Sequence, residues 1–128
     1  MMQQLGLFDA VRRPPLIKKI DAYGSVLQAE PDHTFRLKHP RMAWDRARIE
    51  IHQHRDGTWM WSTRWQCESE GGGYRVGEKW GKFAESREDA LFYAAQEIEQ
   101  RLSGKVSADA ALILKWTASL KDNPEAFK

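Results

Sequence analysis

The sequence predicts one α+β domain, in which an antiparallel meander of three to four strands is followed by two C-terminal helices packed on one sheet face. Two segments of alternating character, 46–54 and 58–67, flank the turn dipeptide Asp56-Gly57, as the strands of a hairpin do. Two segments that begin with a serine and carry apolar residues at helical spacing then follow. A composition of 41% hydrophobic and 30% charged residues over 128 positions fits a single globular domain.

The domain is expected to span residues 31–122. Residues 1–30 are predicted to form a flexible N-terminal arm, because proline and glycine interrupt their short apolar groups. The first strand is predicted over His33 to His39, where apolar and charged residues alternate. Residues 123–128 are predicted to be a C-terminal tail.

Two registers are open to the hairpin, and the apolar pattern distinguishes them. A two-residue loop of Asp56 and Gly57 would place the tryptophans on the face away from the isoleucines. A three-residue loop that begins at Arg55, with Gly57 left-handed, pairs Ile51 with Trp61 and gathers one apolar face, so it is the predicted register. The predicted core side chains are Ile49, Ile51, Trp59, Trp61 and Trp65, and the open face is predicted to carry Arg48, Glu50, His52, His54, Met60, Arg64 and Gln66.

The second half of the chain is predicted to hold a last strand and the two helices. Segment 68–73 reads as a glycine-rich loop and segment 74–80 as a hairpin strand. Ser86 and Ser107 are the predicted N-caps, and Gly104 is expected to end the first helix. The predicted buried residues are Leu91, Ala94, Ala95, Ile98 and Leu102 in the first helix and Ala111, Leu114 and Ala118 in the second, with Leu112 and Trp116 as further candidates.

The residues that could carry chemistry are few. His52 and His54 project from one strand face, but no third ligand has matching spacing, so we predict no metal site and no cofactor. Cys67 is the single cysteine, which excludes an internal disulfide and a four-cysteine zinc site. With no nuclease or hydrolase constellation, the chain is predicted not to be an enzyme. The lone cysteine and the lack of a long apolar run predict a cytoplasmic protein.

The open face is the predicted nucleic-acid surface. A net charge of +2 does not by itself predict such binding, so local clustering must supply it. The predicted contact residues are Arg48, His52, His54 and Arg64, which outnumber Glu50 on that face; Arg36 and Lys38 could join them. In the alternative register, three tryptophans would share this face and base stacking would become attractive.

The N-terminal sequence Gln4-Leu5-Gly6-Leu7-Phe8 resembles the short peptide with which many proteins dock on the bacterial DNA sliding clamp. In that motif family the pattern is Gln-Leu-Ser/Asp-Leu-Phe, so Gly6 departs from it at the most permissive position. The resemblance implies that Gln4, Leu5, Leu7 and Phe8 contact the clamp, with Leu7 and Phe8 as apolar anchors. The alternative is that Leu5, Leu7 and Phe8 pack onto the core of their own domain.

Three function hypotheses follow from these observations. The leading one is a non-enzymatic accessory protein of DNA replication or repair, which docks on the sliding clamp and contacts DNA with its open sheet face. The second is a free-standing module that binds RNA or DNA, in which the N-terminal match is accidental. The third is a protein-interaction or inhibitor module of a mobile element.

Overall fold

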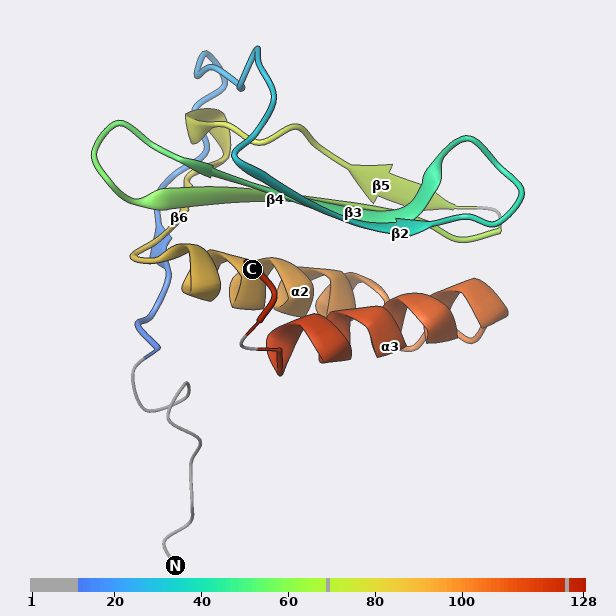
Figure 1. The fold of residues 1–128 in the computed structure, drawn as a ribbon. Coiled ribbons are helices and arrows are strands. Elements are labelled where there is room, and N and C mark those ends of the chain that lie inside the picture. Colours follow the sequence, from blue (N-terminus) through green and yellow to red (C-terminus); the bar gives the residue numbers. More distant parts are fainter. Residues whose placement is uncertain (1–11, 69, 124) are drawn as a thin grey trace, which may run out of the picture.

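The computed structural model describes residues 12–68, 70–123 and 125–128, and it is an antiparallel sheet with two helices on one face (Figure 1). The strand order is β1-β6-β4-β3-β2, and β5 also pairs with β4. The predicted α+β fold is therefore confirmed, with six strands rather than three to four. The strands are β1 (Leu16–Ile17), β2 (His33–Lys38), β3 (Asp45–Gln53), β4 (Trp59–Gln66), β5 (Gly71–Gly73) and β6 (Lys82–Ala84); the helices are the short 3₁₀ helix η1 (Glu78–Trp80), α2 (Arg87–Arg101) and α3 (Ala108–Lys121).

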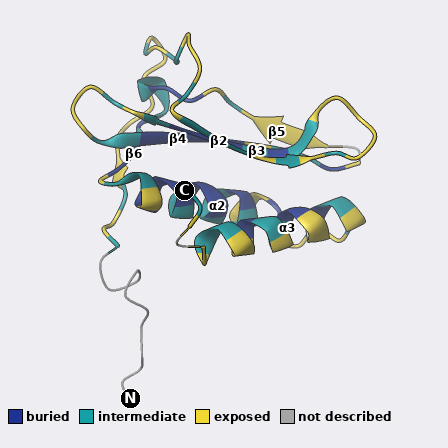
Figure 2. Cartoon of the chain, viewed as in Figure 1, coloured by how far each residue is buried: buried dark blue, intermediate teal, exposed yellow. Residues whose placement is uncertain are grey.

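The β3–β4 hairpin has the register that the apolar pattern predicts. Ile51 lies opposite Trp61 and Ile49 lies opposite Thr63. Gly57 has a φ of 93°, in the left-handed region that favours glycine, and its N–H donates to the carbonyl of His54. Both isoleucines are fully buried beneath the helices, whose sheet-facing sides are also buried (Figure 2).

The edge next to β4 differs from the expectation, because the predicted strand over 74–80 is absent there. Instead β5 pairs with one end of β4 and β6 with the other, and residues 74–81 leave the sheet between them. Val76 in this segment is fully buried. The glycine-rich stretch expected to be a loop thus supplies β5. The segment 74–80, expected to be a strand, instead covers part of the sheet face away from the helices.

The N-terminal arm is joined to the sheet from residue 12 onward. Its segment β1 pairs with β6, and the N–H of Leu27 donates to the carbonyl of Val76 at 2.8 Å. The arm thereby covers part of the face predicted to be open, and Met60 on that face is buried with Val76 and Phe83. The packed domain therefore begins before residue 31. Met60 lies on the predicted sheet face, but it is buried rather than exposed.

Helix α2 follows its prediction closely. The hydroxyl of Ser86 accepts from the N–H of Asp89 at 3.1 Å, as an N-cap does, and all five residues of the predicted apolar face are buried.

Helix α3 is capped by Ser107 as predicted but buries a different face. Ala110, Ile113 and Thr117 are fully buried, whereas Ala111 and Ala118 are exposed. Apolar residues occur on several sides of this helix, so the sequence pattern selects no single face. Thr117 tolerates burial because its hydroxyl donates to the carbonyl of Leu114 at 3.0 Å.

The predicted C-terminal tail also packs on the domain. The ring of Phe127 meets His33 and Phe35 edge to face, with centroids 4.8 and 5.3 Å away. The chain end therefore covers β2 beside the helices.

Candidate nucleic-acid interface

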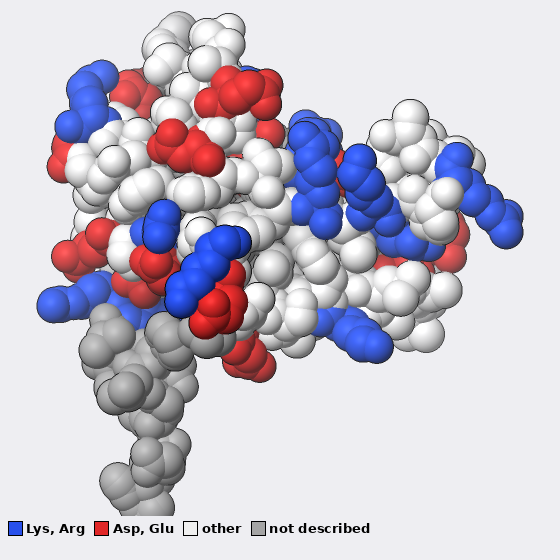
Figure 3. Space-filling view, viewed as in Figure 1, with Lys and Arg blue, Asp and Glu red and all other residues white. Residues whose placement is uncertain are grey.

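Three arginines stand in one line across the sheet face away from the helices. Arg36 on β2 lies directly opposite Arg48 on β3, and Arg48 lies directly opposite Arg64 on β4. We call these three residues the arginine row. With neighbouring strands about 4.8 Å apart, the row spans about 10 Å. Figure 3 shows Lys and Arg side chains gathered on the sheet side, toward the end that carries β5.

Like charges that lie directly opposite each other on neighbouring strands destabilise a sheet. The carboxylates near the arginine row therefore decide how much of its charge is balanced. Arg36 is paired with Asp45 at 2.9 Å, and the Nε of Arg48 is 3.8 Å from a carboxylate oxygen of Glu50. Arg64 is exposed and forms no ion pair with any residue that the structure describes. The row thus has more positive charge than its own carboxylates balance.

A β-bulge brings Asp45 to this face. Lys38 lies opposite Asp45 and Leu37 lies opposite Ala47, so Arg46 is the extra residue of β3. Arg46 reaches the helix side instead, where its Nε donates to Asp109 at 2.8 Å. Without the extra residue, Asp45 would fall on the opposite face.

The glycines of β5 support the end of the row. Gly73 lies opposite Arg64, and a Cβ built on it would come within 2.8 Å of the Cβ and Cγ of Arg64. A Cβ on Gly71 would come within 2.3 Å of the Oε1 of Gln66. The three successive glycines therefore leave room for the side chains of β4 to lie across β5.

The arginine row lines a groove with a volume of about 330 Å³. We call it the arginine groove; Trp44, Asp45, Gln66 and the backbone region of Gly72 also border it. Trp44 is 51% exposed, and its ring centroid is 6.1 Å from that of His39. The Nδ1 of His39 accepts from the backbone N–H groups of Arg41 and Met42 at 3.0 and 3.1 Å, which braces the loop that carries Trp44.

The two predicted histidines are engaged with other parts of the domain. The Nδ1 of His52 accepts from the N–H of Asp32 at 3.1 Å, and the Nε2 of His54 is 2.9 Å from Glu78. The hydrogen bond from His54 lowers the pKa of Glu78. His54 also packs against Phe83 under the N-terminal arm, with ring centroids 5.4 Å apart. Neither histidine borders the arginine groove.

A partly buried carboxylate ties α2 to the sheet. Glu97 accepts from Trp61, Thr63, Tyr74 and Lys82 at 3.2, 2.5, 2.7 and 2.7 Å. Burial alone would raise the pKa of Glu97, but these hydrogen bonds, from Lys82 foremost, lower it below its ordinary value. Burial and the nearby Glu97 raise the pKa of Tyr74. Every oxygen of this cluster is used, so we assign it a structural role.

The described residues contain no group of three or more His, Cys, Asp or Glu side chains arranged to hold a metal. Cys67 is buried, and burial raises the pKa of its thiol. Among the helices of the described part, none has the length and apolar character that crossing a membrane requires.

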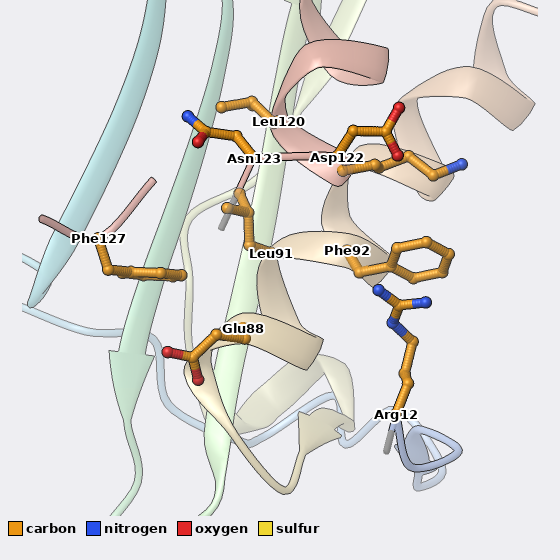
Figure 4. A pocket seen from close by; sticks show the side chains of 9 residues that line it. Arg12, Glu88, Leu91, Phe92, Leu120, Asp122, Asn123 and Phe127 are labelled. Carbon is orange, nitrogen blue, oxygen red and sulfur yellow. The ribbon is translucent and has the colours of Figure 1, made fainter. Parts of the chain in front are cut away.

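A second cavity, of about 40 Å³, lies between the start of α2 and the end of α3 (Figure 4). Its volume is of the order of a single water molecule. At its border the guanidinium of Arg12 lies 3.5 Å from the ring centroid of Phe92. The next residue is held too, since the N–H of Arg13 donates to Asp89 at 3.2 Å and the hydroxyl of Tyr93 donates to the carbonyl of Arg13.

The predicted clamp-docking residues Gln4, Leu5, Leu7 and Phe8 lie outside the described residues.

The structure brings Arg48 and Arg64 of the predicted surface together with Arg36, one of the two further candidates. Lys38, His52 and His54 do not border the arginine groove. Sequence reasoning missed Trp44, which lies in a loop without periodicity. It also missed the support from β5, for which the three successive glycines were the available signal.

Comparison with protein-family models, curated proteins and solved structures gave no significant match to this chain.

Proposed function

We propose that this chain is a non-enzymatic accessory protein that binds nucleic acid, and that the arginine row contacts the phosphate backbone. The observation that carries the proposal is the alignment of Arg36, Arg48 and Arg64 in directly opposite positions on three strands. This alignment opposes folding, because like charges that face each other across strands repel. Local features that oppose folding are expected at functional sites.

Phosphate is the ligand that this arrangement suits best. Arginine presents a planar fork of N–H donors that matches phosphate oxygens. Arg64 is the leading contact because it is exposed and has no carboxylate partner among the described residues. Arg36 and Arg48 must exchange Asp45 and Glu50 for phosphate, so we expect moderate affinity with a strong dependence on salt.

The test is the binding of a fluorescent oligonucleotide of mixed sequence, followed by anisotropy over a range of salt concentrations. Arg64→Gln should weaken binding about tenfold and reduce the slope of log K against log salt by about one. Arg55→Gln is the matched control, because Arg55 is an exposed arginine in the hairpin loop, with 83% of its side chain accessible. Equal affinity of wild type and Arg64→Gln, or no binding by the wild type, would refute the proposal and favour a protein-interaction module.

Docking on the DNA sliding clamp is the second proposed function, and it is compatible with the first. It is supported by the resemblance of residues 4–8 and by the anchoring of Arg12 and Arg13 on α2. That anchor lies against α2, which covers the sheet face opposite the arginine row (Figure 4 shows Arg12 beside Phe92). Four residue steps separate Phe8 from Arg12, so a docked peptide would hold the domain within about 14 Å of the clamp.

Clamp docking is tested separately, with the sliding clamp of the host and a Leu7→Ala, Phe8→Ala double variant. We expect binding in the micromolar range or tighter for the wild type and none for the double variant, because both anchors are removed. Arg64→Gln is the control and should bind the clamp normally. Binding that does not depend on Leu7 and Phe8 would discard the motif.

A further inference from the structure

We infer that the arginine groove takes single-stranded nucleic acid in preference to duplex, with Trp44 stacking on an unpaired base. The inference rests on the proposed nucleic-acid binding and names its substrate class. It comes from the position of one aromatic side chain beside the arginine row. Proteins that bind single strands combine a basic groove with aromatic rings on which bases stack.

Trp44 is the one exposed tryptophan of the six, all of which lie in the described part of the chain. Trp61 is buried in the core, and Trp59, Trp65, Trp80 and Trp116 are half-buried. An exposed tryptophan leaves a large apolar surface in water, so the fold loses the stabilisation that burial of that surface would provide. Trp44 therefore has no role in the core that would explain it. Two tryptophans border the arginine groove, Trp44 and Trp65, and of these Trp65 is half-buried against the core.

The size of the groove also favours an unpaired strand. Its volume of about 330 Å³ lies at the small end of ligand sites and suits one nucleotide unit rather than a double helix. In a duplex the bases are stacked on each other, so a protein ring can reach their faces only after unstacking, which costs a few kcal/mol per step. An unpaired base pays no such penalty.

The loop that carries Trp44 is braced before any ligand arrives. His39 accepts two backbone N–H groups of this loop, from Arg41 and Met42, and its ring lies near Trp44. A platform that is already ordered loses less conformational freedom on binding. We assign His39 as a positioning residue for Trp44.

The experiment compares a labelled single strand of about 12 nucleotides, the matching duplex and a mononucleotide, at one salt concentration. Wild type should bind the single strand more tightly than the duplex. Trp44→Ala should weaken single-strand binding about 5- to 100-fold and leave duplex binding unchanged, whereas Trp44→Phe should retain most of the affinity. Tyr23→Ala is the matched control, because Tyr23 is 98% exposed and does not border the groove.

The outcomes separate this inference from the proposed function. If the single strand and the duplex bind equally and Trp44→Ala changes neither, the inference fails while nucleic-acid binding stands. If neither nucleic acid binds, the proposed function fails and the inference fails with it. If the mononucleotide binds as tightly as the single strand, the groove is a nucleotide site and the inference is overturned. Circular dichroism of each variant verifies that it is folded.

Discussion

Removal of the Glu97 carboxylate should destabilise the domain more than any other single change of a charged residue that we consider. Glu97 is 15% exposed and joins α2 to β4, β6 and the segment after β5 through four donors. In Glu97→Ala, the ammonium of Lys82, which is 24% exposed, loses the carboxylate 2.7 Å away. Breaking one side of a buried pair typically costs about 3–5 kcal/mol, so we expect a loss of about 3 kcal/mol at this partly exposed site.

Glu97→Gln should cost less, about 2 kcal/mol, because its amide can replace part of the network. Lys82 and Trp61 donate to one carboxylate oxygen, whereas the hydroxyls of Thr63 and Tyr74 donate to the other. Hydroxyls can also accept hydrogen bonds, so the amide N–H groups of the introduced glutamine can donate to Thr63 and Tyr74. The amide oxygen then faces Lys82 and accepts from it. The remaining loss is that of the charge opposite Lys82.

Urea unfolding followed by tryptophan fluorescence measures both changes. Thermal unfolding gives a second readout: at about 4 °C per kcal/mol for a chain of this length, Glu97→Ala should lower Tm by roughly 12 °C. Glu70→Gln is the control, because Glu70 pairs with Lys105 at the surface with 55% of its side chain exposed, and should change stability by less than about 0.5 kcal/mol. An alanine variant within about 1 kcal/mol of wild type, or a glutamine variant that is the less stable of the two, would refute this reasoning.

The same carboxylate gives a pH dependence of known sign. Its pKa is lowered in the folded protein from an ordinary value of 4.5, so the unfolded chain binds the proton more readily. The stabilisation from Glu97 is therefore fully present above about pH 4.5 and is lost as pH falls through the lower folded pKa. The difference in unfolding free energy between wild type and Glu97→Gln should shrink over that window. A difference that stays constant below pH 4 would contradict the assigned direction.

Three further changes test the edge strand, the helix cap and the thiol. Gly73→Val should force Arg64 from its position, release β5 and raise amide hydrogen exchange in β4, because its Cβ would lie 2.8 Å from that side chain; unchanged exchange would contradict this. Ser86→Ala should cost about 1 kcal/mol in urea unfolding through loss of the hydrogen bond from Asp89 N–H, and an unaltered midpoint would count against the cap. Cys67 should react slowly with iodoacetamide in the native state and fast in urea, because burial raises the pKa of its thiol; equal rates would show that it is accessible.

The sequence predicted the elements whose side chains alternate or repeat strongly. The register of β3 and β4 followed from the choice to gather Ile49, Ile51 and Trp61 on one face. Helix α2 followed from its cap and its apolar spacing. In α3 apolar residues lie on several sides, so only contact with α2 and the sheet selects Ile113 and Thr117.

The remaining differences arise from interactions between distant segments. No local pattern signals that β1 pairs with β6, or that the segment 74–81 folds over Met60. The candidate site was predicted in part, because strand alternation places Arg48 and Arg64 on one face. Alternation could not show which neighbours bind His52 and His54, nor that a loop brings Trp44 to the same groove.

The interrupted edge of the sheet has a consequence for how these molecules behave in concentrated solution. A long, flat edge invites a neighbouring chain to add its own strand and start a fibril. Here β5 and β6 are three residues each and β1 is two residues. The six-residue β2 carries Arg36 and Lys38, and its end lies opposite the bulge of β3. An incoming copy would find short pairing segments at β1, β5 and β6, and at β2 it would place cations beside cations. The shape and charge of these edges therefore disfavour strand addition between copies of the domain.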